Sequence, residues 1–423
     1  MFNTSKNEFV KKSNCLNVFP YENIPNLMRN LVTNHEQNPF FLFNVDDTIF
    51  KYNLWKEVLP RVQPHYAVKC NNCSMVLRVL AALGTNFDCA TEFEMQQVIS
   101  LGVDPSRIIY AHTTKMLTCL KYAKENNINL ITFDNEEELY KMKQIYPEAR
   151  IIIRIKYDGK AMCKFGVKFG CDPYTEAEKL LQVAFNLNMN VVGVSFHTGS
   201  ELSTPSTLYD AIKAAHHVFQ CGLNLGFDLN VLDIGGGYPG EHGYLLLPYS
   251  NYINMALEEY FPNTSVTIIA EPGTYFVKSA FTLACSVHSL RKNHLNRDEV
   301  DKRALYDYYL TDGVFGNMSA VLSNYFQFIP KLLVTPKENN QYLSTFWGPT
   351  CDPVDRIKEN MYFPKLKIGD WIIFDEMGSY TFVVASRFHG FQPSPIYSVI
   401  GEKNWMLIKD KLSLVSEQES RTK

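Results

Sequence analysis

Eight short runs of β-forming residues alternate with longer amphipathic stretches between residues 65 and 273, and this alternation limits the folds open to the chain. The runs lie at residues 66–68, 87–89, 108–110, 130–133, 151–155, 191–196, 231–234 and 267–270. The stretches between them, such as TEFEMQQVISLG and EAEKLLQVAFNLNM, repeat apolar residues every three or four positions, which is typical of helices. Eight strands that alternate with helices predict a parallel (β/α)8 barrel. A doubly wound open sheet has the same alternation and is the alternative.

The pattern changes after residue 275, where the helical period fades. Aromatic and β-branched runs such as YLSTFWGPTCD and IGDWIIFDEMG are separated there by Gly, Pro and Asn, and they predict an antiparallel β-sandwich. We therefore expect four parts: an N-terminal segment (1–45) whose run NPFFLFNV could add a strand to the β domain, a barrel (46–275), a β-sandwich domain (276–410) and a polar, frayed tail (411–423).

Composition and charge exclude several classes of partner. The chain has 423 residues, 46% of them hydrophobic, and a net charge of -3 without a Lys/Arg-rich run, so we expect a small-molecule substrate rather than nucleic acid. No apolar run approaches the roughly 18 residues that span a bilayer. The start, MFNTSKNEFVKK, lacks the apolar core of a secretory signal, so a cytoplasmic location without membrane contact is expected. The ten cysteines are scattered, and Cys70 and Cys73 lack a second ligand pair, so neither a disulfide framework nor a metal site is expected.

Polar residues end or follow most of the predicted strands. The active sites of (β/α)8 barrels lie at the carboxyl ends of the strands, so these residues are the candidates for chemistry. In chain order they are Lys69, Asp88, Asp134, Arg154, His197, Gly235 to Gly237, and Glu271. One polar residue near a strand is usually solvated or structural. Because so many successive strands end this way, we predict a single polar site.

The segment DIGGGYPG follows the seventh predicted strand, and its three glycines allow backbone N–H groups to approach an anion such as a phosphate. A tight turn without a ligand would also explain the glycines. A phosphate-bearing cofactor accounts for the glycines and Lys69 together, because a lysine amine can form a Schiff base with pyridoxal 5'-phosphate. Glu271 would keep the pyridine nitrogen protonated, and His197 would face the ring.

The segments YAVKCN, FDCATEFE, VVGVSFHTGS, LDIGGGYPG, IIAEPG, WGPTCDPVDRI and IGDWIIF together resemble the eukaryotic ornithine decarboxylase family, which also includes antizyme inhibitor. The resemblance extends from about residue 40 to 400. It implies an alanine-racemase-like barrel with a β-sandwich, pyridoxal 5'-phosphate as cofactor, and a homodimer whose active sites each take residues from both subunits. The implied activity converts L-ornithine to putrescine in polyamine biosynthesis.

The resemblance also implies roles for individual residues. Lys69 matches the cofactor lysine, His197 the residue that stacks on the ring, and Glu271 the partner of the pyridine nitrogen. The positions that match phosphate-binding residues are Ser200, Gly235, Gly236, Gly237 and Tyr380, and those that match the polar network behind the cofactor are Asp88, Glu94 and Arg154.

Further matches concern the substrate and the partner subunit. Cys351 matches the cysteine that the partner subunit contributes to protonate the substrate carbon, although a cysteine without context is more often a buried structural thiol. Lys168 and Asp355 match a pair that bridges the dimer. The positions that match the substrate pocket are Asn324, Asp352 and Phe388.

Two positions depart from the family pattern. The family's EPG motif is followed by an arginine that binds the cofactor phosphate, whereas this chain has Thr274. Losing a charged hydrogen bond costs on the order of 1.5–3 kcal/mol, or roughly ten- to a hundredfold in affinity, so we expect weaker cofactor binding. Asn324 replaces the aspartate that meets the distal ammonium of ornithine, and Ser323 replaces a tyrosine. No Asp or Glu occurs between Asp312 and Glu338, so a neutral or longer basic amino acid is an alternative substrate.

An inactive regulator that resembles antizyme inhibitor and sequesters antizyme is the alternative from a different class. The two departures favour it, whereas the retention of the candidate residues at the strand ends and of Cys351 and Tyr380 favours an enzyme. The family's antizyme-binding surface corresponds to the helix around Lys115, Lys121 and Lys124. A solvated basic face is the other interpretation of these lysines.

Overall fold

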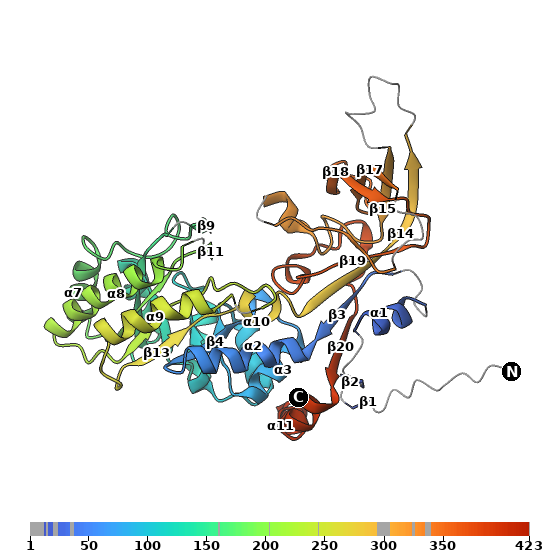
Figure 1. Ribbon diagram of the computed structural model, residues 1–423. Coiled ribbons are helices and arrows are strands. Elements are labelled where there is room, and N and C mark those ends of the chain that lie inside the picture. Colours follow the sequence, from blue (N-terminus) through green and yellow to red (C-terminus); the bar gives the residue numbers. More distant parts are fainter. Residues whose placement is uncertain are drawn as a thin grey trace. The chain divides into compact units, whose positions relative to one another are not determined.

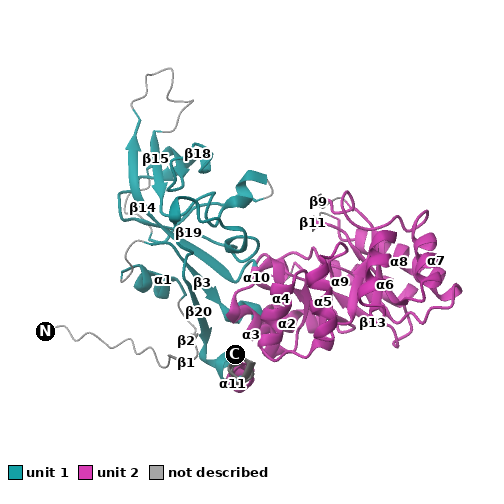
Figure 2. Cartoon of the chain, turned by 180° about the vertical axis from the view of Figure 1, so that it is seen from behind, with its two compact units in different colours: residues 1–48, 278–407 teal, residues 49–277, 408–423 magenta. Residues whose placement is uncertain are grey.

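The computed structural model describes residues 12–13, 16–19, 24–33, 38–159, 161–202, 204–243, 245–293, 305–323, 326–334 and 340–422 (Figure 1). The described residues fall into two compact units (Figure 2). The barrel unit takes its residues from 49–277 and 408–423, and the β unit takes its residues from 1–48 and 278–407.

A closed ring of eight parallel strands forms the centre of the barrel unit. In chain order the strands are β4 (Val62–Ala67), β5 (Asn86–Cys89), β6 (Ile108–Tyr110), β7 (Leu130–Phe133), β8 (Arg150–Lys156), β10 (Asn190–His197), β12 (Val231–Asp233) and β13 (Thr267–Ala270). The ring closes because β13 pairs with β4, with Ile268 opposite Val62. The predicted (β/α)8 barrel is therefore confirmed, and the open sheet is excluded. Its strands are buried on both faces, which explains their continuous apolar runs, such as Ile151 to Ile153 in β8.

Helices connect successive strands of the barrel. They are α3 (Ser74–Leu83), α4 (Glu92–Ser100), α5 (Leu117–Glu125), α6 (Glu136–Ile145), α7 (Ala177–Asn186), α8 (Thr207–Asn224) and α9 (Leu247–Tyr260). Helix α2 (Val45–Val58) precedes β4, and the short α10 (Thr274–Val277) follows β13. Local signals define their ends: Gly84 ends α3 in a left-handed conformation, with φ of 91°. Two short antiparallel strands outside the ring, β9 (Ala161–Cys163) and β11 (Ser200–Leu202), were not predicted.

The β unit contains a ten-stranded sheet. Its strands are β1 (Lys12–Ser13), β2 (Leu16–Phe19), β3 (Phe40–Asn44), β14 (Phe281–Lys292), β15 (Tyr306–Leu310), β16 (Lys331–Leu332), β17 (Gln341–Trp347), β18 (Arg356–Pro364), β19 (Trp371–Phe374) and β20 (Ile396–Gly401). The run NPFFLFNV supplies β3, which pairs with β14 and β20. Helix α1 (Ile24–Thr33) packs its buried residues Leu27 and Met28 into the same apolar cluster as Phe40.

The sheet of the β unit is mixed rather than purely antiparallel. The pairs β2–β20, β20–β3 and β15–β17 are parallel, and the other pairings are antiparallel. The β domain predicted as antiparallel therefore contains three parallel pairs. The apolar pattern of a strand indicates which of its faces is buried but carries no information on the direction of its neighbour.

Residues 402–422 form helix α11 (Glu402–Thr422), so the prediction of a frayed tail from residue 411 is wrong. Ile408, Leu412 and Val415 are buried. These residues recur at intervals of four and three and therefore lie on one face of the helix. This buried apolar face stabilises the helix, most of whose other positions are polar.

None of the described helices combines the length and the apolar character needed to cross a bilayer. Within the described ranges, no three His, Cys, Asp or Glu side chains gather as a metal site would require. Cys70 and Cys73 are both free thiols.

Candidate active site

Lys69 and Asp88 form an ion pair at the carboxyl ends of the adjacent strands β4 and β5. Lys69 lies in a single 3₁₀ turn after β4, and Asp88 is the register partner of Ala67. The Lys69 Nζ atom donates a hydrogen bond to Asp88 Oδ2. The Asp88 side chain is fully buried, whereas 39% of the Lys69 side chain is exposed. A buried carboxylate therefore holds an amine that a ligand can still reach.

Two further acids are buried beside this pair. Asp233 ends β12 and is 1% exposed, and Glu271 follows β13 and is 8% exposed. Burial raises the pKa of Asp233 to about 7, with Asp88 adding to the effect. Burial and the neighbouring Asp233 raise the pKa of Glu271 well above its usual range. Buried carboxyl groups this close cannot both ionise readily, so the pair retains a proton at neutral pH.

His197 ends β10 and presents a neutral ring. Its Nδ1 atom accepts a hydrogen bond of 3.1 Å from the Gly199 N–H, so the proton of the neutral ring resides on Nε2. Burial, followed by the charges of Arg154 and Lys69, lowers the pKa of His197 well below its usual range. The Phe165 ring contacts the imidazole edge to face, with 4.9 Å between centroids. An uncharged, flat side chain is suited to stack on a planar ligand.

Arg154 and Glu94 complete the polar network around the barrel mouth. Arg154 lies in β8 opposite Ser195 of β10, and its guanidinium lies 5.4 Å from the centroid of the Phe169 ring. Glu94 Oε2 accepts a hydrogen bond of 2.6 Å from Ala90 N–H at the start of α4. Burial, with a contribution from Asp88, raises the pKa of Glu94. Glu94 therefore combines a helix-capping contact with an electrostatic coupling to the Lys69–Asp88 pair.

The three glycines after β12 require the absence of a side chain. Gly235 and Gly237 have positive φ angles of 65° and 99°. A Cβ atom on Gly236 would lie 2.6 Å from the Glu271 carbonyl oxygen and 3.0 Å from His197 Nε2. The loop therefore brings its backbone against the ends of β10 and β13, where N–H groups can bind an anion.

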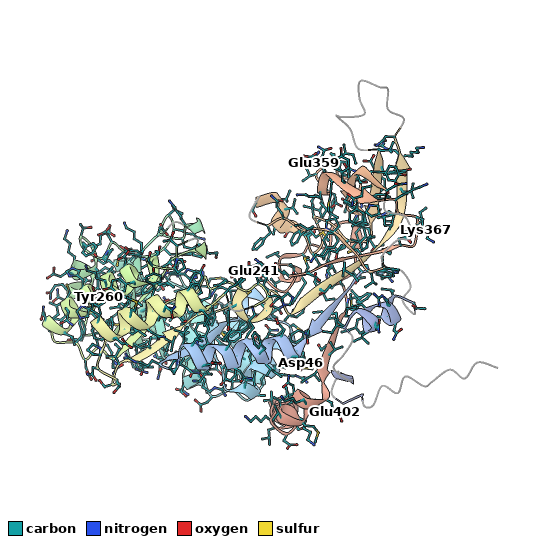
Figure 3. All side chains as sticks on the ribbon, in the orientation of Figure 1. Asp46, Glu241, Tyr260, Glu359, Lys367 and Glu402 are labelled. Atoms are coloured by element: carbon teal, nitrogen blue, oxygen red, sulfur yellow. The ribbon has the colours of Figure 1, made fainter. Side chains whose placement is uncertain are left out.

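Lys51 in α2 holds the far end of this glycine loop, a role that sequence reasoning missed. Its side chain is buried, and its Nζ atom donates to the carbonyl oxygens of Gly240 at 2.9 Å and Glu241 (Figure 3) at 2.6 Å. The hydroxyl of Tyr275, in α10, donates to the Lys51 carbonyl at 2.8 Å. Lys51 thus links the glycine loop to the helix that begins at Thr274. Lys51 is one of several charged residues in α2, so no signal in the sequence singled it out.

Thr274 and Ser200 both lie at the beginning of an element. Thr274 is half-buried at the start of α10, and its Oγ1 atom lies 3.9 Å from Cys70 Sγ. Ser200 is half-buried at the start of β11 and pairs with Cys163 of β9. Each supplies a hydroxyl without a charge.

Asp134 follows β7, as predicted, and both Asp134 and Lys115 make structural contacts. Asp134 Oδ2 accepts a hydrogen bond of 2.7 Å from Gly170 N–H. Lys115 is buried, and its Nζ atom lies 2.7 Å from the Thr132 carbonyl oxygen and 2.9 Å from Glu138 Oε1. Burial lowers the pKa of Lys115 to about 8.

Lys115 therefore does not belong to an exposed basic face, and that expectation is wrong. Lys115 also precedes α5, which begins at Leu117. Lys121 is exposed, and Lys124 forms an ion pair of 3.2 Å with Glu148. The sequence around Lys115 does not reveal that the buried Glu138 and the carbonyl oxygens of Thr132 and His112 accept hydrogen bonds from this lysine.

The remaining candidates belong to the β unit. Cys351 is exposed, so the alternative of a buried structural thiol is wrong, and its Sγ atom lies 3.4 Å from His389 Nε2. Asp352 Oδ1 accepts a hydrogen bond of 2.8 Å from Val354 N–H.

Phe388 packs against Phe315 with 4.9 Å between ring centroids. Tyr380 is half-buried and has a positive φ of 52°. Asn324 lies outside the described residues, and Ser323 Oγ donates to the Ala320 carbonyl at 2.8 Å.

Asp355 stabilises the turn that carries Cys351. Its carboxylate is 1% exposed and accepts hydrogen bonds from Val314 N–H at 2.7 Å, Thr350 N–H at 2.9 Å and Thr350 Oγ1 at 2.7 Å. Lys168 is exposed in the barrel unit, with its Nζ atom 5.0 Å from the centroid of the Phe169 ring. Pairing of Lys168 with Asp355 across a dimer stays a prediction.

Comparison with known proteins agrees with this arrangement. Residues 45–278 match the family model described as pyridoxal-dependent decarboxylase, pyridoxal binding domain. The chain is 42% identical over 384 residues to ornithine decarboxylase of Rattus norvegicus, covering 88% of this chain and 83% of that protein. It is 39% identical over 396 residues to antizyme inhibitor 2 of Xenopus laevis, covering 91% of this chain and 87% of that protein.

A solved structure gives the same assignment. The arginine decarboxylase of Paramecium bursaria Chlorella virus, bound to agmatine, superposes with a TM-score of 0.84 at 36% identity and covers 89% of this chain and 100% of that one. The match extends over both the barrel unit and the β unit. The chain therefore belongs to the pyridoxal-dependent decarboxylases, in the family that includes eukaryotic ornithine decarboxylase.

Proposed function

We propose that the protein is a carboxy-lyase that decarboxylates an amino acid with pyridoxal 5'-phosphate bound at Lys69. The arrangement of Lys69, Asp88, Asp233 and Glu271 at one end of the barrel carries the proposal. These residues fit the cofactor, because Asp88 Oδ1 has no hydrogen-bond partner among the described residues and the glycine loop leaves its backbone open to a phosphate. When bound, the cofactor withdraws electrons from the substrate α-carbon as the carboxylate leaves.

Each residue of the site then has a specific task. Lys69 would hold the cofactor covalently through its amine, and Asp88 would orient that amine. The pair of Asp233 and Glu271 would keep a proton at the pyridine nitrogen of the cofactor, and the neutral His197 would stack on its ring. The groups proposed to bind the phosphate are the N–H groups of Gly235, Gly236 and Gly237, the hydroxyls of Ser200 and Thr274, and Tyr380. Arg154 and Glu94 support this network from behind.

We propose further that the enzyme acts in the cytoplasm as a homodimer, in which the partner subunit's Cys351 donates a proton to the substrate carbon. Mixing an inactive Lys69→Ala variant with an inactive Cys351→Ala variant tests this assembly. If each site takes Lys69 from one subunit and Cys351 from the other, mixed dimers regain activity through the site in which both residues are intact. Recovery of no activity after subunit exchange would contradict a shared site.

Ornithine is the first candidate substrate, because the rat relative is named ornithine decarboxylase and the viral relative binds agmatine, another cationic amine. Asp352 supplies one carboxylate for a distal cation, while Asn324 supplies an amide. An amide contributes a dipole instead of a charge, so ornithine should bind less tightly than it would between two carboxylates. Lysine, arginine and neutral amino acids are the alternatives.

Release of carbon dioxide from a panel of ornithine, lysine, arginine and leucine tests the activity and the substrate together. Asn324→Asp is expected to raise kcat/KM for ornithine about tenfold, the effect of roughly 1.4 kcal/mol from a charge-assisted contact. Asn324→Gln, which retains the amide, is the matched control. An unchanged preference in Asn324→Asp would remove this residue from the substrate pocket, and release from none of the amino acids by the cofactor-loaded protein would refute the enzyme.

Thr274→Arg is expected to tighten cofactor binding about ten- to a hundredfold, because a guanidinium adds a charged hydrogen bond to the phosphate. Titration of the cofactor-free protein, followed by the visible absorption of the bound cofactor, measures the affinity. Thr274→Val, which removes the hydroxyl without adding charge, should weaken binding. Equal affinities of the wild type and Thr274→Arg would show that Thr274 does not face the phosphate.

The regulator alternative rests on the 39% identity to antizyme inhibitor 2 and on the neutral Thr274. The complete set of Lys69, Asp88, His197 and Glu271 favours the enzyme, because sequestering a protein requires none of these groups. Binding of antizyme to the exposed face of α5 around Lys121 is compatible with either function. Antizyme binding by a protein that releases no carbon dioxide would favour the regulator.

A further inference from the structure

A histidine faces the thiol of Cys351 in the β unit. The Cys351 Sγ atom and the His389 Nε2 atom are 3.4 Å apart, which is within hydrogen-bonding distance for sulfur. Both side chains are exposed, so each can exchange protons with water. Neither the strand-end candidates nor the family resemblance drew attention to His389.

The position of His389 is enforced by an unfavourable backbone conformation. His389 has a positive φ of 59°, and Gly390 follows it with φ of 79°. Residues other than glycine adopt this region infrequently, and such positions cluster at functional sites. The turn directs the imidazole towards the thiol, so the strained conformation and the short contact concern the same side chain.

Two aromatic rings lie near the imidazole. The Phe388 ring lies 4.2 Å from the His389 ring between centroids, and the Phe391 ring lies 6.4 Å away and nearly parallel, at 17°. The turn that carries Cys351 is held by the buried Asp355. Aromatic rings therefore lie near His389, and the contacts of Asp355 hold the turn that carries Cys351.

We propose that His389 is the residue with which Cys351 exchanges its proton, so that the thiol is restored after each proton transfer to the substrate carbon. This inference deepens the proposed function and rests on it. His389 does not touch the substrate in this scheme and acts through Cys351 as a positioning residue.

The proton balance of this step is closed. The Cys351 S–H bond breaks as the proton passes to the substrate carbon, which leaves a thiolate. The imidazolium form of His389 donates its Nε2 proton to that thiolate, and the imidazole then takes up a proton from water. No electrons are transferred to or from either residue, and no further reactant is required.

The nearest charged groups in sequence do not replace the imidazole. Asp352 directs Oδ1 to the Val354 N–H, and Asp355 is occupied by Val314 and Thr350. Arg387 is exposed two residues before His389. In the described part of the β unit, His389 is the titratable side chain that lies within hydrogen-bonding distance of Cys351.

Alkylation of Cys351 by iodoacetamide in the cofactor-free full-length protein, measured by mass spectrometry of the Cys351 peptide, tests the pair without requiring catalysis. Iodoacetamide reacts with the thiolate, and an imidazole that accepts the thiol proton generates thiolate at lower pH. We expect alkylation at pH 6.5 to be about tenfold faster in the wild type than in His389→Asn, with rates that converge above pH 9. Identical pH profiles would overturn the inference.

The choice of His389→Asn and an internal control exclude a structural explanation. Asn tolerates positive φ values, so this variant retains the backbone turn. Cys221, whose Sγ atom lies 3.9 Å from His217 Nε2, is measured in the same digest. Its alkylation rate should be the same in both proteins, and a change in both cysteines would indicate a disturbed fold and overturn the specific role of His389.

Activity measurements connect the pair to turnover. His389→Gly should lower kcat about tenfold, less than the loss of a direct proton donor to the substrate because His389 acts through Cys351; KM should be unchanged, and free imidazole should restore kcat. Absence of rescue would overturn the proton-exchange role. The two proposals fail separately: a histidine-dependent alkylation profile without carbon dioxide release refutes the decarboxylase, whereas normal release with identical profiles refutes the role of His389.

Discussion

Lys69→Arg is expected to abolish decarboxylation, with kcat lowered on the order of 10³-fold or more, the scale of a lost covalent catalyst. Arginine retains the positive charge that pairs with the buried Asp88, so the barrel mouth should stay intact. The guanidinium cannot lose its proton, and therefore cannot attack the aldehyde of the cofactor. The loss would thus report the chemistry of the amine rather than its charge.

Borohydride reduction followed by peptide mass spectrometry measures the covalent link itself. The wild type should carry the reduced cofactor on the peptide that contains Lys69, and Lys69→Arg should carry none. Lys121→Arg, at an exposed lysine of α5, is the matched control and should behave as the wild type. Recovery of the label on another lysine of Lys69→Arg would displace Lys69 from its proposed role.

The cofactor-free protein is expected to lose stability as the pH rises from about 4 to about 7, because of Asp233. The folded-state pKa of Asp233 is about 7, above its ordinary value of 3.8. Between these values the folded protein retains a proton that the unfolded chain has released, so raising the pH favours unfolding. Glu271 contributes with the same sign, because its pKa is also raised. The free energy of unfolding should fall by a few kcal/mol over this range, since each pKa unit corresponds to about 1.36 kcal/mol.

The difference between the wild type and Asp233→Asn isolates this contribution. His65 and His197 have lowered pKa values and add a slope of opposite sign, which is common to both proteins. Urea unfolding between pH 4.5 and 7.5 should show that Asp233→Asn gains stability relative to the wild type as the pH rises. The exposed Asp228→Asn is the control. Parallel stability curves for the wild type and Asp233→Asn would contradict the buried, protonated acid.

The barrel and its polar end could be predicted because each depends on short sequence patterns within single segments. Each strand of the ring is a separate apolar run, and each candidate residue stands at the end of its own run, as Asp88 does in FDCATEFE. The geometry of a parallel barrel then brings these ends together without further information. The glycines of DIGGGYPG were similarly informative, because their positions near Phe196, His197 and Glu271 leave no room for a Cβ atom.

What the sequence could not show depends on contacts between distant segments. In the sequence, Lys51 is one charged residue of a helix. Only the fold brings its amine to the carbonyl oxygens of Gly240 and Glu241, which are 189 and 190 positions away. The burial of Lys115 depends on Glu138 and Thr132 in the same way. The contact of His389 with Cys351 joins residues 38 positions apart. Helix α11 is the exception. The helical spacing of its buried residues Ile408, Leu412 and Val415 is visible in the sequence, although many polar residues surround them.

Closure of the ring by β4 and β13 has a consequence for biosynthesis. The pairing of Val62 with Ile268 spans about half of the chain, so the ring stays open until β13 has left the ribosome. Lys69 is made early, but Glu271 emerges some two hundred residues later. A nascent chain that stalls before β13 would therefore expose the apolar edges of β4 and β12 without a complete cofactor site. Chaperones would therefore bind this protein while its sheet is still open. The cofactor site would be complete only when β13 pairs with β4 and the sheet closes into a barrel.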